Sequence, residues 1–316
     1  MIKRPVLPLM LLTLASIFLF FLLNLLLGSV HIPLRSVWNI LWGNTDESVI
    51  WQNIIWKSRV PQALTALVAG AGLSVSGLQM QTVFRNPLAG PSVLGISSGA
   101  SLGGVALSRL GYMGEVALSV AAIIGALAVM ALIVYVSQKV KGNVTLLIIG
   151  VMIGYVASAV IGVLKYFSVE EDIRAYVIWG LGSFARVSGD QMVLFVCIMA
   201  VLLPLSFLGL NIKRARLLVI SCSGVLVAIV TAYCGPIMFI GLAVPHLCRA
   251  IFHSSDHRVL MPATLLVGAS LALVCNLIAR MPGFEGALPV NSVTALVGAP
   301  VVASVLFRKR KGELNE

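Results

Sequence analysis

Charged side chains are scarce in this sequence of 316 residues. Asp, Glu, Lys and Arg make up 10% of it, whereas hydrophobic residues make up 59%, and the mean hydropathy is +1.03. Average soluble domains carry about 25% charged residues, so this composition excludes a soluble globular protein. Short segments of alternating polarity, typical of membrane β-barrels, are also absent. Apolar runs long enough to cross a hydrocarbon core of about 30 Å recur instead, and helices satisfy the backbone there. We therefore predict an all-α polytopic membrane protein with a single transmembrane domain over 1–316.

Motifs of catalysis and metal binding are missing as well. No G-x-x-x-x-G-K-[ST] phosphate loop occurs, so the chain cannot hydrolyse ATP itself. The five cysteines stand singly in apolar surroundings without a metal-ligand spacing, which indicates small buried residues rather than a disulfide framework. No soluble basic domain accompanies the net charge of +11, which argues against nucleic-acid binding. We expect no catalytic, cofactor-binding or metal-binding residue, and a protein that is not an enzyme.

About ten membrane spans are predicted, at 6–29, 61–83, 92–110, 115–138, 143–165, 190–210, 216–234, 237–251, 258–279 and 290–308. The segment 237–251 is short and interrupted, so a full crossing is least expected there. The first run follows Lys3 and Arg4, as in a signal peptide, but it exceeds the usual core of about 7–15 residues, which favours a retained helix. Ten crossings place both termini on one side. If that side is the cytoplasm, fourteen Lys and Arg residues lie inside and eight outside, as the positive-inside rule requires. The net positive charge is then explained by a basic cytoplasmic face next to anionic lipid.

Two of the predicted loops carry more than a simple connection needs. The loop 31–60 holds four tryptophans, which suits amphipathic elements at the outer membrane interface. The loop 166–189 holds the acidic run 170–172.

A polar elbow at 85–95 joins two glycine-rich apolar runs. It reads Arg-Asn-Pro-Leu-Ala-Gly-Pro-Ser-Val-Leu-Gly. The residue before a proline is disfavoured in the α region, so Asn-Pro and Gly-Pro break any continuous helix here. The small residues on both sides, at 70–77 and 95–104, favour close helix packing in lipid.

Three further blocks are distinctive. Residues 234–249 read C-G-P-I-M-F-I-G-L-A-V-P-H-L-C-R and are followed by Asp256-His257-Arg258, and residues 288–300 read L-P-V-N-S-V-T-A-L-V-G-A-P. A shorter block is Arg59-Val60-Pro61. Within the first block, His246 could bind a ligand or relay a proton, but a lone histidine more often hydrogen-bonds its neighbourhood.

Together these blocks resemble the signatures of the FecCD/BtuC-like family, the permease subunits of type II ABC importers. The residues that carry the resemblance are Arg85, Asn86, Pro87, Gly95, Gly241, Pro245, His246, Arg249, Asp256, His257, Arg258, Pro289, Gly298 and Pro300. The chain departs from the family pattern at Gln62, where the family has arginine, and at Asn291, where many members have glycine.

The resemblance implies a permease with ten helices in the bacterial inner membrane, with cytoplasmic termini. It implies a homodimer that works with two ATPase subunits and an extracytoplasmic binding protein, and an iron–siderophore complex, haem or cobalamin as cargo. The fifth and tenth helices of such permeases line the pathway. Polar candidates there are Tyr155, Ser158, Asn291, Ser292 and Thr294, although ordinary hydrogen bonding between helices also accounts for such residues.

Arg59 and Arg280 match the positions at which family permeases receive acidic residues of the binding protein. The planar guanidinium fork suits carboxylates, while interfacial anchoring is an equal alternative.

The region that couples a permease to its ATPase is where the resemblance weakens. Family members carry two Leu-Gly pairs between the sixth and seventh spans, and this chain has only the second, at Leu208-Gly209, followed by Lys213, Arg214 and Arg216. Either a segment is unrecorded near Ser206-Phe207, or coupling differs or is lost. Two rivals therefore accompany the importer hypothesis: a non-transporting family member, and a stand-alone secondary carrier. The carrier is disfavoured because its expected intramembrane charges and repeat halves are not visible.

Overall fold

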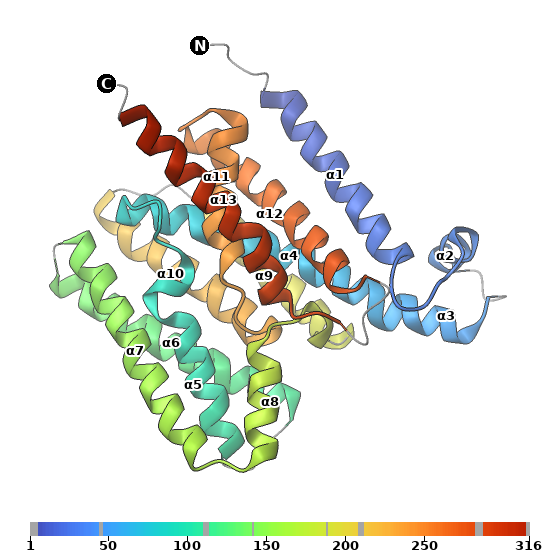
Figure 1. Cartoon of the computed structure of the whole chain (residues 1–316), viewed down its shortest axis with the longest axis horizontal. Helices are drawn as coiled ribbons and strands as arrows, with labels where there is room; N and C mark the ends of the chain where they lie inside the picture. Colours follow the sequence, from blue (N-terminus) through green and yellow to red (C-terminus); the bar gives the residue numbers. More distant parts are fainter. Residues whose placement is uncertain are drawn as a thin grey trace.

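The computed structural model describes residues 6–43, 47–109, 114–140, 142–187, 189–207, 212–281 and 287–313, and every regular element within these ranges is a helix (Figure 1). The elements are α1 (Val6–Leu26), α2 (Leu34–Leu41), α3 (Val49–Ile54), η1 (Ile55–Arg59), α4 (Val60–Phe84), η2 (Pro91–Leu94), α5 (Ile96–Arg109), α6 (Glu115–Lys139), α7 (Asn143–Tyr166), α8 (Glu170–Gly180), η3 (Phe184–Arg186), α9 (Gly189–Phe207), α10 (Ile212–Cys234), α11 (Phe239–Phe252), α12 (His257–Ala279) and α13 (Val290–Glu313). The all-α prediction is confirmed for the described residues.

Helix α4 lies at the centre of the bundle and packs against α9, α10, α11 and α12. Its small residues allow this, because a Cβ atom on Gly77 would overlap the carbonyl oxygen of Gly241 in α11. The same holds between α5 and α6, where a Cβ atom on Gly99 would lie 2.7 Å from the carbonyl oxygen of Gly125. The predicted role of these small residues in helix packing is thus confirmed.

Six helical segments of the described residues are long and apolar enough to cross a membrane: α1, the continuous segment Val49–Phe84, α6, α7, the part of α10 from Leu217, and α12. Shorter apolar helices cover Gln191–Ser206, Phe239–Phe252 and Val290–Ala303. Each of the ten predicted spans coincides with a helix, while ten full crossings stay a prediction.

Helix α11 differs from its prediction in being continuous. The predicted interruption of 237–251 is wrong, because the helix runs unbroken from Phe239 to Phe252 and includes Pro245. Pro245 cannot donate to the carbonyl of Gly241 one turn earlier, but α4 packs directly against that carbonyl at Gly77. The fourteen residues of α11 extend about 21 Å, which is shorter than the hydrocarbon core.

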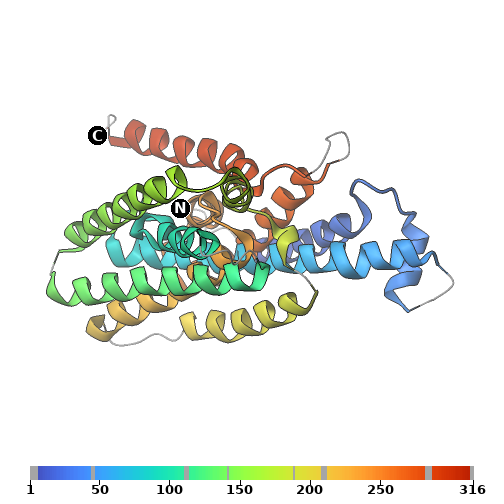
Figure 2. The same cartoon turned by 90° about the horizontal axis from the view of Figure 1, so that it is seen from below.

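The second predicted span begins earlier than expected. Helix α3, the π-helical turn η1 and α4 form one segment of 36 residues from Val49. The π-helical turn ends at Arg59, two residues before Pro61, whose missing N–H cannot serve a regular α-helical hydrogen bond. The start of this segment, α3, projects together with α2 at one end of the bundle (Figures 1 and 2).

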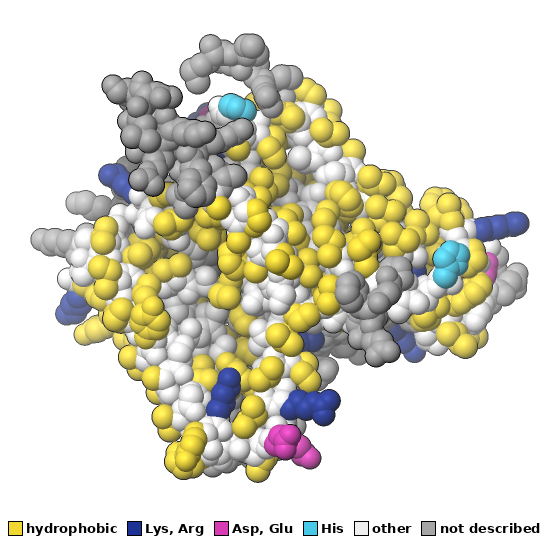
Figure 3. All heavy atoms as spheres, in the orientation of Figure 1, with side chains coloured by type: hydrophobic (Ala, Val, Ile, Leu, Met, Phe, Trp, Pro, Cys, Tyr) yellow, Lys and Arg dark blue, Asp and Glu magenta, His cyan; other side chains and the backbone are white. Residues whose placement is uncertain are grey.

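The surface of the bundle is dominated by apolar side chains. In Figure 3 these cover most of the visible face, and the Lys, Arg, Asp and Glu side chains lie toward its margins. The start of α1 and the end of α13 both lie on the side away from α2 and α3 (Figure 1). These features fit a protein embedded in lipid on most of its circumference.

Candidate functional site: a signature elbow and an arginine pocket

The elbow after α4 is a defined turn between two helices. Arg85 ends α4 in the left-handed conformation, with φ of 49°, and Gly95 takes φ of 74° just before α5 begins. The amide N–H of Asn86 donates to the carbonyl of Gln81, and the Asn86 side chain accepts from the N–H of Leu88. The predicted break of the helix at the two X-Pro steps is confirmed.

Two side chains of α11 hold this elbow and the end of α4 before it. His246 Nε2 lies 2.9 Å from the carbonyl oxygen of Pro87. Arg249 donates to Oε1 of Gln81 at 2.8 Å, and the Gln81 amide donates in turn to the carbonyl of Leu242 at 3.2 Å. His246 therefore forms a hydrogen bond with its surroundings, which is the more common of the two roles considered for it, the other being a ligand or proton-relay site.

The remaining signature residues serve helix ends and contacts. Asp256 is the N-cap of α12, and its side chain accepts from the N–H of Arg258 at 2.9 Å. His257 and Arg258 are exposed. The Pro289 carbonyl accepts from Val293 at the start of α13. A Cβ atom on Gly298 would lie 2.9 Å from Cβ of Phe239, so α13 approaches α11 closely there. Pro300 lies within α13.

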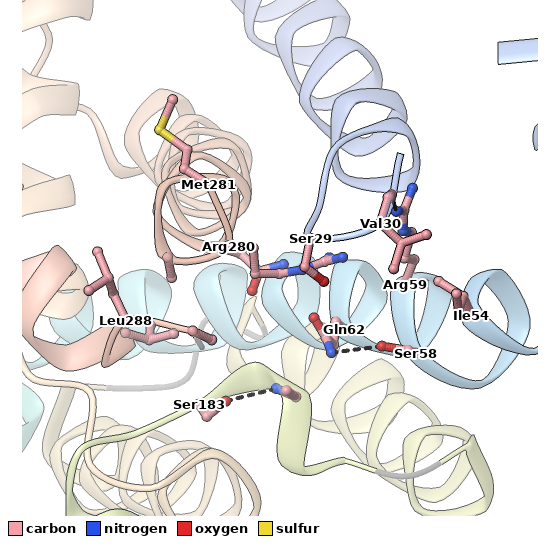
Figure 4. A pocket seen from close by; sticks show the side chains of 15 residues that line it. Ser29, Val30, Ile54, Ser58, Arg59, Gln62, Ser183, Arg280, Met281 and Leu288 are labelled. Carbon is pink, nitrogen blue, oxygen red and sulfur yellow. Dashed lines mark hydrogen bonds between the residues drawn. The ribbon is translucent and has the colours of Figure 1, made fainter. Parts of the chain in front are cut away.

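A cavity of about 420 Å³ opens where α1 ends, α4 begins and α12 ends. Figure 4 shows Arg280 reaching past Ser29, with Arg59 beneath Val30. The lining also includes Ser58, Gln62, Ser183, Asn276 and apolar side chains such as Ile54, Met281 and Leu288. Among the described residues that line it, none is acidic.

Arg59 is almost completely buried, with 1% of its surface exposed. Its Nη1 atom donates to the carbonyls of Leu25 at 2.6 Å and Leu26 at 2.8 Å, and its Nη2 atom donates to the carbonyl of Val30. The last carbonyls of a helix have no partner within the helix. Arg59 thus completes the hydrogen bonding of α1 at its end, a role that the sequence analysis did not consider.

Arg280 lies next to Arg59. A Cβ atom on Gly28 would lie 3.0 Å from Nη2 of Arg280 and 3.2 Å from Nη2 of Arg59, so both guanidinium groups converge on one point. Burial, together with the neighbouring charge of Arg59, lowers the pKa of Arg280 to about 10. The structure therefore brings the two predicted docking residues together, but only Arg280 is partly exposed.

Two asparagines within apolar helices extend this network, and the sequence analysis missed them. The Asn24 amide donates to the carbonyl of Leu273 at 3.0 Å, and the Asn276 amide donates to Oδ1 of Asn24 at 2.8 Å. Arg280 Nη1 lies 3.5 Å from the Asn24 carbonyl. The available signal was the presence of an amide side chain in a run that must satisfy its polar groups internally.

The predicted pathway residues fall into two groups. Tyr155 and Ser158 are exposed on α7, and Ser292 is exposed on α13. Thr294 is buried and donates to the carbonyl of Asn291, whose own side chain accepts from the N–H of Met238. Within one chain, α7 packs against α5, whereas α13 packs against α11 and α12.

The predicted coupling residues are only partly visible. Leu208 and Gly209 lie outside the described residues. Helix α10 begins at Ile212, so the backbone of Lys213, Arg214 and Arg216 is helical, while their side chains are not described.

The bundle has the long apolar helices of a multi-pass membrane protein. The model of the FecCD transport family matches residues 15–208 and 206–308, nearly the whole chain. The chain therefore belongs to the FecCD transport family, whose members are membrane permeases of ABC transporters with the ATPase in a separate subunit. The two matched stretches meet at 206–208, where the sequence analysis finds the coupling segment shortened.

Curated relatives and a solved structure agree with this assignment. The chain is 37% identical to the vitamin B12 import system permease protein BtuC of Klebsiella pneumoniae, over 82% of this chain and 84% of the relative. It is 35% identical to the hemin transport system permease protein HmuU of Yersinia pestis, over 90% and 91%. A solved chain of a metal-chelate type ABC transporter in an inward-facing conformation matches with a TM-score of 0.81 and 30% identity, over 95% of this chain and 99% of that one.

Proposed function

We propose that this chain is the membrane-spanning subunit of a binding-protein-dependent ABC importer that moves a metal chelate into the cytoplasm. Vitamin B12 and hemin, the cargoes in the names of two relatives, are both metal chelates. The cargo classes are an iron–siderophore complex, haem or cobalamin. The family match over nearly the whole chain is the observation that carries the proposal. A separate ATPase supplies the energy.

A second copy of the chain completes the pathway in this proposal. The faces of α7 and α13 that leave Tyr155 and Leu296 exposed, by 66% and 77%, face the partner and the cargo route. The pathway residues of this proposal are the exposed Tyr155, Ser158 and Ser292, together with the partly buried Asn291 and the buried Thr294. The wall is otherwise apolar, which suits a cargo that must be released as readily as it is taken up.

The binding protein docks at the end of the bundle that carries Arg280. Arg280 is the group that meets a carboxylate of the docked protein, since it is partly exposed. Arg59 contributes charge from beneath, because its own donors are engaged by α1. The termini and the residues Leu208, Gly209, Lys213, Arg214 and Arg216 face the ATPase in the cytoplasm.

Reconstitution in liposomes with the candidate ATPase and binding protein tests this function. We expect ATP hydrolysis to rise with loaded binding protein and cargo to accumulate inside. Arg280→Glu should reduce the stimulation at least about tenfold, because it reverses a charge at a docking contact. Arg35→Glu is the matched control, since Arg35 is an exposed arginine at the same end of the molecule.

The alternative of a non-transporting family member follows from the meeting of the two matched stretches at 206–208. It predicts that the chain assembles with no ATPase, and that outcome would overturn the importer proposal. Cargo uptake without any ATPase would instead favour a stand-alone carrier.

A further inference from the structure

The arginine pocket gathers two positive charges without an acidic group among its described lining residues. Like charges that converge in a partly dehydrated recess repel each other strongly, because water screens them poorly there. The lowered pKa of Arg280 reflects this repulsion in part. A buried pair of cations is ordinarily stabilised by a counter-charge.

Two polar atoms at the pocket are left without a partner. Nε of Arg59 is buried and donates to no acceptor, although the other donors of that guanidinium engage three carbonyls of the α1 end. Oε1 of Gln62 is likewise unpartnered, while its Nε2 lies 3.1 Å from the Ser58 hydroxyl. The oxygen and nitrogen of a glutamine amide can exchange places. If they do, Gln62 accepts from Ser58 and presents its amide donors to the cavity.

We propose that this pocket binds a small inorganic anion from solution between Arg59, Arg280 and Gln62. The anion accepts hydrogen bonds from the guanidinium groups and the Gln62 amide, and it neutralises the converging charges. A sulfate or phosphate ion is far smaller than a cavity of about 420 Å³, so ordered water fills the remainder. The bound anion links the end of α1, the start of α4 and the end of α12, and its binding can be tested without the import function proposed above.

Anion occupancy also bears on docking. A carboxylate of a docked protein and a free anion would compete for Arg280, which is the partly exposed member of the pair. Loss of import in a variant therefore does not test the proposal, and binding of the anion itself must be measured.

The test uses the purified full-length protein in detergent without added lipid. Thermal unfolding is followed while sulfate replaces gluconate at constant ionic strength, and equilibrium dialysis with radiolabelled sulfate gives the stoichiometry. We expect a saturable rise in Tm with sulfate and one ion bound per chain, since a ligand that binds only the folded state stabilises it. Equal curves in sulfate and gluconate, with no bound label, would overturn the proposal.

Variants assign the site. Arg280→Gln should raise the sulfate Kd at least about tenfold, because it removes a charge-assisted hydrogen bond, and Arg280→Lys should weaken binding less. Arg35→Gln, in an exposed arginine, should leave the Kd unchanged. If Arg280→Gln does not fold, Gln62→Ala serves in its place, with weaker binding expected. Retained affinity in the folded variants would exclude the pocket as the site.

Glu285 needs its own control, because it lies outside the described residues in the segment between Arg280 and the lining residue Ala287. Glu285→Gln should leave the sulfate titration unchanged. If sulfate binds only after this substitution, the carboxylate of Glu285 is the counter-charge and the proposal fails.

Discussion

Arg59 shows how backbone carbonyls can hold a charged side chain within an apolar bundle. Three backbone carbonyls at and just after the end of α1 accept its donors. The cost of dehydrating the guanidinium is offset by hydrogen bonds to groups that would otherwise lack partners. The hydrogen bonds of Arg59 therefore assign it a structural role, whether or not it also contributes to docking.

Arg59→Ala should destabilise the protein by about 3 kcal/mol, since several buried carbonyls lose charge-assisted hydrogen bonds. Arg59→Lys should restore part of this stability, because an ammonium keeps the charge but not the planar fork. Thermal or denaturant unfolding in detergent measures both. The exposed Arg35 supplies the control, as Arg35→Ala should change stability little. An Arg59→Ala protein as stable as the wild type would contradict the capping role.

For single residues, the sequence indicated which side chains are important better than it indicated what they contact. The Arg-Val-Pro block placed Arg59 correctly before a long helix, but the acceptors of its hydrogen bonds lie 29 to 34 residues earlier in the chain. Nothing in the local sequence predicts which distant carbonyls reach a side chain. For His246 the position within an apolar run already favoured a local hydrogen bond, and the partner at Pro87 could only come from the packing of α11 on the elbow.

Among the elements, the contact of α4 with α11 depends on the absence of a side chain at one position. A Cβ atom on Gly77 would overlap the backbone of Gly241, which cannot move as a flexible side chain could. Gly77→Ala should therefore force the helices apart and lower stability by about 2 kcal/mol or more. Unfolding in detergent is the measurement.

Gly104 in α5 is the matched control for Gly77. A Cβ atom there would meet nothing within 4 Å, so Gly104→Ala should be neutral or stabilise by up to about 1 kcal/mol through helix propensity. Equal effects at Gly77 and Gly104 would show that the close approach is not needed for stability.

Helix α2 turns one face inward and another outward. Val37 and Ile40 are buried in a small cluster with Ile55, whereas Trp38 and Trp42 are exposed by 57% and 76% and lie against each other. Tryptophan is enriched where a membrane meets water. We therefore predict that this face rests in the outer interface.

Brominated lipids test the position of α2. Quenching by bromine near the headgroup should exceed quenching by bromine deep in the acyl chains for Trp38 and Trp42, measured as the signal lost in Trp38→Phe and Trp42→Phe. The buried Trp179 offers a comparison within the chain, and Trp179→Phe should remove little quenchable signal. Equal signal loss at all three positions would contradict an interfacial face.

The helices themselves were well predicted, because length and hydropathy reflect the physical demand of the bilayer. The early start of the segment from Val49 was missed, since Pro61 is a normal sign of a helix start and the π-helical turn before it has no sequence signal. The continuity of α11 through Pro245 was missed because a proline inside an apolar run ordinarily indicates a break. Here α11 packs closely on α4 at Gly241, and sequence periodicity alone cannot show such a contact.

For the whole molecule, α7 and α13 each carry apolar side chains that no other described part of the chain covers. Helix α7 packs on α5 and leaves Tyr155, Val156 and Val160 exposed. A lipid-facing helix has no need of Tyr155 or Ser158 in mid-span, since polar groups there cost free energy in hydrocarbon. The proposed second copy would cover this face and account for both the exposure and the polarity.

Cysteine cross-linking distinguishes a partner from lipid at this face. In a background without reactive native cysteines, Ser158→Cys should form a covalent dimer in native membranes with a short bifunctional reagent. Val120→Cys, on an exposed part of α6, should not. Dimers at both positions would indicate random collision, and dimers at neither would leave α7 facing lipid. Within one chain, α7 packs mainly on α5, and α13 packs mainly on α11 and α12. The proposed cargo route therefore needs a partner chain opposite α7 as its second wall. A dimer formed by Ser158→Cys but not by Val120→Cys is the result on which the proposed pathway depends.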